Sequence, residues 1–461
     1  MQIERIKSSF RDPNGFLFKQ NGILYRQINK KYEENYDLLM SSKLFENLIK
    51  KKLLVNHELV DIPAYLPEIS YLIIQPELIP FISYPYEWSF SQLKNAALTT
   101  LRIQKVALNH GMNLKDASAY NIQFMNGKAV LIDTLSFEKY QNGRPWVAYR
   151  QFCQHFLAPL ALMSLRDIRL NQLLRVYIDG VPLDLASKLL PWTSHLNFGL
   201  LTHIHTHARV QKQFANTIQN ESKDKNELSL NSLLGLIDSL ESIIKNLKWK
   251  PTGTEWGDYY TATNYSNEAF VEKAKMVKEY LEVAGPGIVW DMGANTGEFS
   301  KIACNEGMQT ISFDIDPAAV EKNYLTSRKE KNELILPLVM DLTNPSSGMG
   351  WQNCERSSLL ERGPANTVMA LALIHHLAIS NNVPLTGIAE YFSQLGKWLI
   401  IEFVPKSDSQ VKRLLFSRED IFDHYTKDDF EENFKLHFEL VKNEQIQGTE
   451  RFLYLFKCKE E

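Results

Sequence analysis

The chain has 461 residues, of which 44% are hydrophobic and 23% are charged, and its formal net charge is −3 at pH 7. This is an ordinary globular composition over a length that suits about two or three domains. The small net charge gives no sign of a bulk phosphate-binding surface, so nucleic acid is not expected as a partner, although a local basic groove stays open.

No run of about 18 apolar residues is present, so we expect no membrane span. The first residues carry charges and lack an apolar core, which is not the pattern of a signal peptide. The four cysteines lie far apart and form no CxxC pair, which argues against a zinc ribbon or a disulfide scaffold. Dispersed, reduced thiols are typical of the cytoplasm, and we expect a cytoplasmic protein.

The N-terminal half begins with two predicted strands in GFLFKQNGILYRQI, residues 15–28, joined at Asn21-Gly22. Asn-Gly is the strongest short-range hairpin signal because both residues accept positive φ angles. Helices are predicted over residues 32–52 and 91–110.

A second motif follows in HGMNLKDASAYNIQFMNGKAVLIDTLSFE, where Asp116 precedes Asn121 by five residues and a hairpin turning at Asn126-Gly127 leads to Asp133. The spacing resembles the catalytic loop and metal-binding acid of protein kinases and aminoglycoside-type phosphotransferases. By that resemblance Asp116 would polarise an acceptor hydroxyl, and Asn121 and Asp133 would hold magnesium.

The first half also departs from that family. No glycine-rich phosphate loop precedes the motif and no VAIK-type lysine is evident, although Arg26 lies on a predicted strand in the corresponding region. Leu114-Lys115 stands before Asp116 where the family has His or Arg. The third residue of the DFG-type motif, which begins at Asp133, is Leu135 instead of glycine. Three interpretations stay open: an active phosphotransferase, a degenerate kinase-like domain that binds substrate or partner, and simple turn residues.

His203, His205 and His207 alternate in LTHIHTHARV. On a strand they would share a face and could hold a metal. The surrounding sequence indicates helix or loop instead, so we expect no metal here and leave the role of the three histidines open.

A domain boundary is predicted near residue 250, between a kinase-like or substrate-recognition domain (1–250) and a second domain (251–461). The polar stretch NTIQNESKDKNELS precedes an amphipathic helix whose leucines and isoleucines recur at spacings of three and four between Leu230 and Leu247. KWKPTGTEWGDYY then breaks the helix with Pro251 and two glycines.

After this predicted domain boundary, apolar runs alternate with amphipathic helices. The runs are GIVWDM, MQTISFDI, LILPLVMD, TVMALAL, KWLIIEFV, HFELVKN and RFLYLFK. The alternation predicts a mostly parallel sheet covered on both faces, and the last two strands, with no helix between them, should form a hairpin. The predicted fold class is therefore α/β, a Rossmann-like seven-stranded domain preceded by a mixed α+β, helix-rich domain.

The turn after the first of these strands reads VWDMGANTGEFS. Ligands of doubly wound sheets bind beyond the carboxyl ends of the strands, yet the turn fits neither GxxxxGK[ST] nor GxGxxG. Asp291 would repel a pyrophosphate and favour a ligand with a positive group. Asp314 after the second strand could accept from a ribose diol, and Asp341 after the third from an adenine amino group. S-adenosylmethionine has this combination of an adenosine and a cationic tail.

Residues 285–461 thus resemble the class I S-adenosylmethionine-dependent methyltransferases. Their DxGxxxG motif is met by Asp291, Gly293 and Gly297, while Asn295 stands where the family often has glycine. The resemblance implies that these residues shape the site for the amino-acid end of the cofactor, Asp314 that for the ribose and Asp341 that for the adenine. Their neighbours Ala294, Ile315 and Leu342 complete the expected cofactor-binding set.

His375 and His376 follow the fourth strand, VMALALIHHL, on the side where an acceptor should approach. One of them could be a general base, or could cap or pack under the loop. Glu402 and Tyr265 are further pocket candidates with structural or substrate-shaping roles. The long insertion at residues 345–364 is expected to shape substrate access.

No DPPY/NPPY-type motif follows the fourth strand, which again argues against a nucleic-acid base as acceptor. The overall pattern is also similar to bacterial nodulation-type methyltransferases, which implies a small-molecule or glycoconjugate acceptor. Two alternatives stay open: a bifunctional protein whose first half phosphorylates the same substrate, and a non-catalytic scaffold that binds S-adenosylmethionine. The acceptor atom and the oligomeric state are not predicted.

Overall fold

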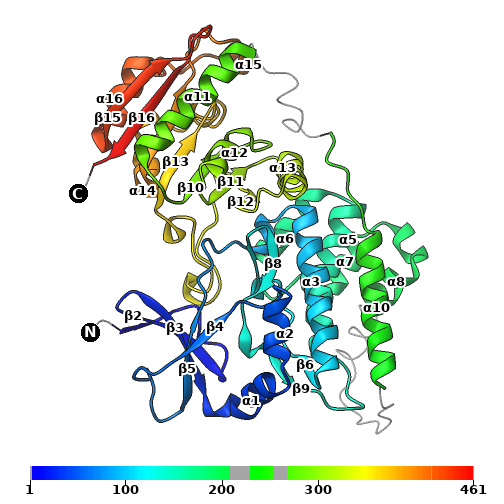
Figure 1. Ribbon diagram of the computed structural model, residues 1–461. Helices are drawn as coiled ribbons and strands as arrows, with labels where there is room; N and C mark the ends of the chain where they lie inside the picture. The colour runs from blue at the N-terminus through cyan, green and yellow to red at the C-terminus, as the bar shows by residue number, and fades with distance from the viewer. Residues whose placement is uncertain (1–2, 208–228, 254–266, 417, 460–461) are drawn as a thin grey trace. The chain divides into compact units, whose positions relative to one another are not determined.

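The computed structural model describes residues 3–207, 229–253, 267–416 and 418–459 (Figure 1). The chain forms two compact units. The first comprises Met1–Lys250 together with Gly350–Glu355, and the second comprises Pro251–Met349 together with Arg356–Glu461. The boundary between the units falls between Lys250 and Pro251, a few residues after the amphipathic helix ends at Asn246.

An antiparallel five-stranded sheet with the order β1-β2-β3-β5-β4 opens the first unit. Its strands are β1 (Ile3–Arg5), β2 (Gly15–Gln20), β3 (Ile23–Asn29), β4 (His57–Val60) and β5 (Ser70–Pro76). The predicted hairpin is confirmed, because β2 pairs with β3 and the turn residues Asn21 and Gly22 have φ angles of 51° and 81°.

The prediction of one helix over residues 32–52 is wrong. The structure has two helices, α1 (Glu33–Ser41) and α2 (Leu44–Lys50). Lys43 between them has a φ of 61°, and a left-handed residue cannot continue a right-handed helix.

The rest of the first unit is mainly helical. Its longest helix, α3 (Phe90–Asn109), confirms the prediction for residues 91–110 and begins at a capping box formed by Ser89 and Gln92. Two small sheets follow, one of β6 (Met112–Leu114) with β9 (Phe137–Lys139) and one of β7 (Ile122–Met125) with β8 (Lys128–Leu131). The second contains the hairpin predicted at Asn126-Gly127.

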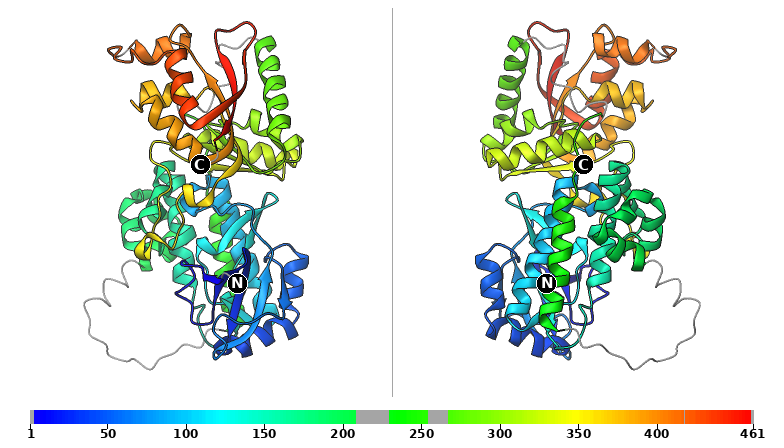
Figure 2. Two further views of the ribbon diagram at one scale, coloured as in Figure 1. Left: turned by 90° about the vertical axis from the view of Figure 1, so that its left-hand side faces the viewer. Right: turned by 90° about the vertical axis from the view of Figure 1, so that its right-hand side faces the viewer.

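Among the described residues, the remaining α-helices of the first unit are α4 (Tyr149–Phe152), α5 (Ala158–Leu165), α6 (Leu173–Val176), α7 (Leu183–Leu189), α8 (Phe198–Leu200) and α10 (Leu230–Asn246). As predicted, α10 is amphipathic, and its buried stripe includes Leu233, Ile237, Leu240 and Ile244. It packs beside α3, as the right view of Figure 2 shows.

The second unit contains a seven-stranded sheet with the order β12-β11-β10-β13-β14-β16-β15. The strands are β10 (Val289–Met292), β11 (Thr310–Asp314), β12 (Ile335–Val339), β13 (Ala365–Ala370), β14 (Gly396–Phe403), β15 (Phe438–Gln445) and β16 (Phe452–Cys458). The first five are parallel, and β15 and β16 form an antiparallel hairpin at one edge. The number of strands and the terminal hairpin match those that the alternating pattern predicts.

Six helices accompany this sheet: α11 (Asn267–Ala284), α12 (Glu298–Asn305), α13 (Pro317–Glu330), α14 (Leu385–Leu395), α15 (Ser409–Leu415) and α16 (Lys427–His437), among the residues that the structure describes. The strand order reverses at β10, from which the chain runs to β11 and β12 on one side and later to β13 and β14 on the other. Right-handed crossovers then place α12 and α13 on one face and α14 on the opposite face. α11 packs beside α12 and α16 packs beside α14 (Figure 1).

The core between α11, α12 and the sheet is apolar. It includes Val277, Tyr280, Val289, Phe299, Met369, Ile400 and Leu455, all buried. This core fixes β10 and the start of α12, and with them the turn that joins the two.

Candidate cofactor and acceptor site

A cavity of about 320 Å³ lies at the carboxyl ends of the parallel strands of the second unit. Its lining comes from α11, from the ends of β10 and β11, from the turns after β10, β11 and β12, from the turn and short π-helix (His376–Ser380) after β13, and from α12 and α15. The lining residues are Phe270, Lys273, Asp291, Gly293, Ala294, Asn295, Phe299, Asp314, Ile315, Met340, Asp341, Leu342, Thr343, Leu371, Ala372, Leu373, His376, Leu377, Ser380, Asn381 and Leu414.

The structure therefore brings the residues predicted to bind the cofactor to one cavity, with the exception of Gly297. Gly297 lies behind the lining as the residue before α12, with a φ of 83°. A Cβ atom at this position would come within 2.5 Å of the Asn323 side chain. Its role is thus the close approach of α12 and α13 rather than contact with a ligand.

Asn295, the departure from the expected glycine, has a φ of 49°. Asparagine adopts this left-handed conformation more readily than most residues that have a Cβ atom. Gly293, two residues earlier, also has a positive φ, of 78°. The turn therefore keeps a left-handed backbone at Asn295 although the sequence lacks glycine there.

Two buried carboxyl groups face the cavity. Asp291 accepts a hydrogen bond from the Ser300 hydroxyl (2.6 Å). Burial, together with the nearby Asp314 charge, raises the pKa of Asp291 to about 7 although the Ser300 bond opposes the shift. Asp314 accepts from the backbone N–H groups of Asn295 (2.7 Å) and Asp316 (2.8 Å), and burial raises its pKa to about 6 against these two bonds.

Asp341 lies after β12 in a more exposed part of the lining. Its Oδ1 atom accepts from the backbone N–H and the hydroxyl of Thr343 (2.8 and 2.7 Å). These bonds fix the short turn that carries Leu342 and Thr343 into the cavity wall.

The structure distinguishes the two histidines after β13. His376 lines the cavity, whereas His375 lies outside the lining and is 2% exposed. Burial and the Arg451 charge lower the pKa of His376 to about 4, so its imidazole is neutral at pH 7. Of the two candidates, only His376 is in position to meet a molecule in this cavity.

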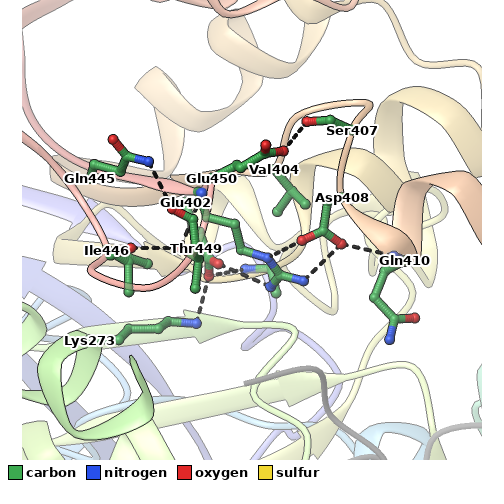
Figure 3. A network of polar contacts seen from close by, with 12 residues as sticks. Lys273, Glu402, Val404, Ser407, Asp408, Gln410, Gln445, Ile446, Thr449 and Glu450 are labelled. Carbon is green, nitrogen blue, oxygen red and sulfur yellow. Dashed lines mark hydrogen bonds and ion pairs between the residues drawn. The ribbon is translucent and has the colours of Figure 1, made fainter. Parts of the chain in front are cut away.

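A buried ionic network lies beside the cavity (Figure 3). The Lys273 ammonium lies 2.6 Å from Glu402 Oε2, and the two side chains are 3% and 0% exposed. Glu402 Oε1 accepts from Arg451 Nη1 (3.2 Å), and Arg451 also donates to both oxygens of Asp408 (2.8 and 3.1 Å). Glu402 is thus close to the cavity wall, as predicted, but it is not part of the lining.

Lys273 is a charged residue of the cavity lining that the sequence pattern did not predict. It lies three residues after Phe270 and four before Val277, on the apolar stripe of α11, and this position was the available signal. A lysine on such a stripe is ordinarily taken as a side chain that snorkels to solvent. Tyr265, the other pocket candidate, lies outside the described residues.

In the first unit, the structure brings the kinase-like motif residues into one neighbourhood. Arg26 Nη2 lies 2.6 Å from Asp133 Oδ1, and the Ser136 hydroxyl donates to Asp133 Oδ2. Asn121 Nδ2 lies 3.5 Å from Ser136 Oγ, and Asp116 accepts from Gln151 Nε2 (2.8 Å). Although burial alone would raise the pKa of Asp133, Arg26 and Ser136 lower it, while burial and the Asp133 charge raise the pKa of Asp116.

The alternating histidines lie on and just after a π-helical segment, Leu201–Thr206. His203 and His207 both pack against the Tyr149 ring, whereas His205 has other partners. His203 contacts Tyr149 and Ser239, whereas His205 contacts Ser187 and Ser194. In the described ranges, no three or more His, Cys, Asp or Glu side chains are grouped as metal ligands.

The long insertion contributes two short 3₁₀ turns, Trp351–Asn353 and Leu360–Arg362, and part of it groups with the first unit. Its role in substrate access stays a prediction. Within the part of the chain that the structure describes, no helix is long and apolar enough to cross a bilayer.

No protein-family model matches the chain. The nodulation protein NoeA of Rhizobium meliloti (strain 1021) is 34% identical to it over 469 residues, which cover 99% of this chain and 96% of that protein. The similarity therefore spans both units.

Several solved structures are similar to less than half of the chain. The PH0226 protein from Pyrococcus horikoshii OT3 is 16% identical, covering 45% of this chain and 100% of that one, with a TM-score of 0.32. The N-methyltransferase NodS from Bradyrhizobium japonicum WM9 is 12% identical, covering 42% and 99%, with a TM-score of 0.30. The magnesium protoporphyrin IX methyltransferase ChlM from Synechocystis PCC 6803, solved with bound SAH, is 15% identical, covering 44% and 93%, with a TM-score of 0.32. At these TM-scores the overlaps support no further conclusion.

Proposed function

The chain belongs to the NoeA family of nodulation proteins, and we propose that it transfers a methyl group from S-adenosylmethionine to a small-molecule or glycoconjugate acceptor. The second unit carries the transfer site, and the first unit selects or presents the acceptor. The name of the relative, a nodulation protein, supports a small-molecule or glycoconjugate acceptor rather than nucleic acid.

The observation that carries the proposal is the charge arrangement of the cavity at the strand reversal. Asp291 is the second-last residue of β10, Asp314 is the last residue of β11, and Lys273 of α11 lines the same space. A carboxylate and an ammonium in one cavity complement the opposite charges of an amino-acid group. Two carboxyl groups without a P-loop disfavour a pyrophosphate.

The residues present fit the cofactor. The cavity of about 320 Å³ is at the lower end of the usual range for small-molecule sites, about 300–1,000 Å³. Asp291 would hold the amino group, Asp314 the ribose hydroxyls, and Asp341 with Leu342 the adenine. When bound, the cofactor supplies an electrophilic methyl group on a sulfonium.

The chain's own residues would contribute alignment and a proton acceptor. Alignment of two reacting groups is a large part of any displacement reaction. His376 is neutral at pH 7 and lines the cavity, so it could take the proton of an acceptor hydroxyl or amine. Leu373, Leu377 and Leu414 form apolar wall that would keep water from the reacting groups.

The test uses the full chain with S-adenosylmethionine labelled in its methyl group and a bacterial extract separated into small-molecule, glycan, protein and nucleic-acid fractions. We expect label in a small-molecule or glycan product. Asp314→Asn should lose this product and Glu432→Gln, which removes a charge from the exposed side of α16, should keep it. Label in nucleic acid would contradict the acceptor class. Tight cofactor binding with no labelled product from any fraction would favour the non-catalytic scaffold.

A bifunctional protein is the second candidate, favoured by the clustering of Asp116, Asn121 and Asp133 in the first unit. Asp133 is already paired with Arg26, so magnesium would have to compete with a guanidinium. Titration with magnesium-ATP tests this function. Heat that Asp133→Asn abolishes would support it, and the absence of heat would leave the first unit as a recognition module.

A further inference from the structure

One carboxylate oxygen of Glu402 accepts hydrogen bonds from two residues that line different sides of the cavity. Its Oε2 accepts from Lys273 Nζ (2.6 Å) and also from the backbone N–H of Ala372 (2.9 Å). Lys273 belongs to α11 and Ala372 to the turn after β13, and both residues line the cavity. Glu402 itself is 0% exposed, so these bonds are shielded from water.

Ala372 has a φ of 51°. This left-handed conformation is unfavourable for any residue with a Cβ atom that lacks a local polar side chain. The bond from its N–H to Glu402 is therefore part of what holds the turn. His376 follows four residues later, so the direction in which that imidazole enters the cavity depends on this turn.

Lys273 depends on the same carboxylate. Burial lowers the pKa of this lysine, and the Glu402 charge opposes the shift. The ammonium also lies 4.5 Å from the centre of the Phe299 ring, at the cavity wall. Without Glu402, the ammonium would lose its ion-pair partner, and a buried lysine in that situation tends to lose its proton.

The network extends to a third wall. Arg451 bridges Glu402 and Asp408, and the Oδ1 atom of Asp408 caps α15 by accepting from the Gln410 N–H (2.8 Å). Figure 3 shows Lys273, Glu402 and Asp408 arranged along this path. α15 carries Leu414 into the cavity lining.

We propose that Glu402 is a positioning residue that couples cofactor binding to the acceptor side. It holds the Lys273 ammonium where the carboxylate of the cofactor's amino-acid end would lie, and it holds the Ala372 turn from which His376 enters the cavity. This inference rests on the proposed methyltransferase function. It adds Lys273 as the carboxylate-binding residue and assigns Glu402 a role on both sides of the reaction.

The experiment compares two ligands by calorimetry on the full chain. S-adenosylhomocysteine carries the amino-acid end, and 5′-methylthioadenosine lacks it. Lys273→Met should lower the affinity for S-adenosylhomocysteine by about tenfold or more, as expected for a lost charge-assisted bond. It should change the affinity for 5′-methylthioadenosine by less than about twofold. Glu402→Gln should show the same selectivity, and Glu432→Gln should change neither ligand.

A second readout separates positioning from general damage. Glu402→Gln should also slow methyl transfer at saturating cofactor. Adding Ala372→Gly, which makes the left-handed turn favourable by itself, should recover part of the transfer rate but none of the S-adenosylhomocysteine affinity. A merely structural role for Glu402 would weaken both ligands alike, and Ala372→Gly would recover nothing.

The outcomes are distinct. If the wild-type chain binds neither ligand, the proposed function is wrong and this inference falls with it. If it binds both but Lys273→Met weakens them equally or not at all, only this inference is overturned. Should Glu402→Gln fail to fold, Lys273→Met with the same two ligands still tests the carboxylate-binding side, and equal weakening of both ligands would overturn the inference.

Discussion

The backbone N–H of Asn295 donates a hydrogen bond to Asp314 Oδ2 over 2.7 Å. This contact joins the turn after β10 to the acid after β11, two strands that lie side by side in the sheet. It fixes the carboxylate at the rim of the cavity. The two motifs that point to an adenosine ligand are thus parts of one hydrogen-bonded element.

The close contact at Gly297 predicts a specific loss of stability. Gly297→Ala would require a left-handed alanine and would also push against the Asn323 side chain. Gly307, with a φ of 78° and nothing within 4 Å of a Cβ atom, is a matched control for the backbone conformation alone. We expect Gly307→Ala to cost about 1–2 kcal/mol and Gly297→Ala to cost about 1–3 kcal/mol more. Urea unfolding measures both, and equal losses would mean that the contact with Asn323 is unimportant.

The raised pKa of Asp291 predicts a pH dependence. The unfolded carboxyl ionises near its usual pKa of 3.8, whereas the folded one stays protonated up to about pH 7. Between these values the folded state binds the extra proton, so this group makes the free energy of unfolding fall as the pH rises, by at most about 1.4 kcal/mol per pH unit.

Asp291→Asn should remove that contribution. Between about pH 5 and about pH 7, the free energy of unfolding should decrease less in the variant than in the wild-type chain. The exposed Asp428→Asn is the control and should leave the slope unchanged. Identical slopes in wild type and Asp291→Asn would contradict the raised pKa of Asp291.

A role for His376 as proton acceptor predicts a loss in rate without a loss in cofactor affinity. His376→Gln should lower the rate of methyl transfer by about 10²–10⁴, the usual contribution of general-base catalysis. Calorimetry should show S-adenosylhomocysteine binding within about twofold of wild type. His424→Gln, at a side chain that is 96% exposed, is the control and should keep the full rate. A normal rate in His376→Gln would exclude the histidine as base.

Two ion pairs of equal length allow a test of how much Arg26 contributes to the stability of the first unit. The Arg26–Asp133 and Arg169–Asp167 pairs both have an N–O distance of 2.6 Å, but the side chains are 12% and 16% exposed in the first and 80% and 39% in the second. Arg26→Met should cost about 3–5 kcal/mol because it strands a buried charge. Arg169→Met should cost about 0–1 kcal/mol. Similar losses in urea unfolding would show that the Arg26 pair is effectively solvated.

The elements that the sequence predicts well are those with strong local signals. The Asn21-Gly22 and Asn126-Gly127 turns need positive φ angles that few other residue pairs supply, and both occur as predicted. The alternation of apolar runs and amphipathic helices predicts the seven strands and their final hairpin. The break at Lys43 is different, since a lysine in the left-handed conformation has no sequence signal.

In the candidate site too, some residues follow from local sequence signals and others do not. The acids at the strand ends follow from the rule that ligands bind where parallel strands terminate, and Asp291 and Asp314 do meet in one cavity. The contributions of Lys273 and Ala372 could not be predicted, because both depend on Glu402, which lies 129 residues from Lys273. Likewise, two adjacent histidines carry no sequence signal that tells which of them, His375 or His376, lines the cavity.

The most direct test of the account is calorimetric titration of the full chain with S-adenosylhomocysteine, repeated on Asp314→Asn. We expect binding near micromolar, about −8 kcal/mol, and a loss of about 1.5–3 kcal/mol in the variant because a charge-assisted bond to the ribose is removed. Asp428→Asn should bind as the wild-type chain does. If S-adenosylhomocysteine gives no heat with the wild-type chain, or if Asp314→Asn binds it equally well, the cavity of the second unit is not the cofactor site that we propose.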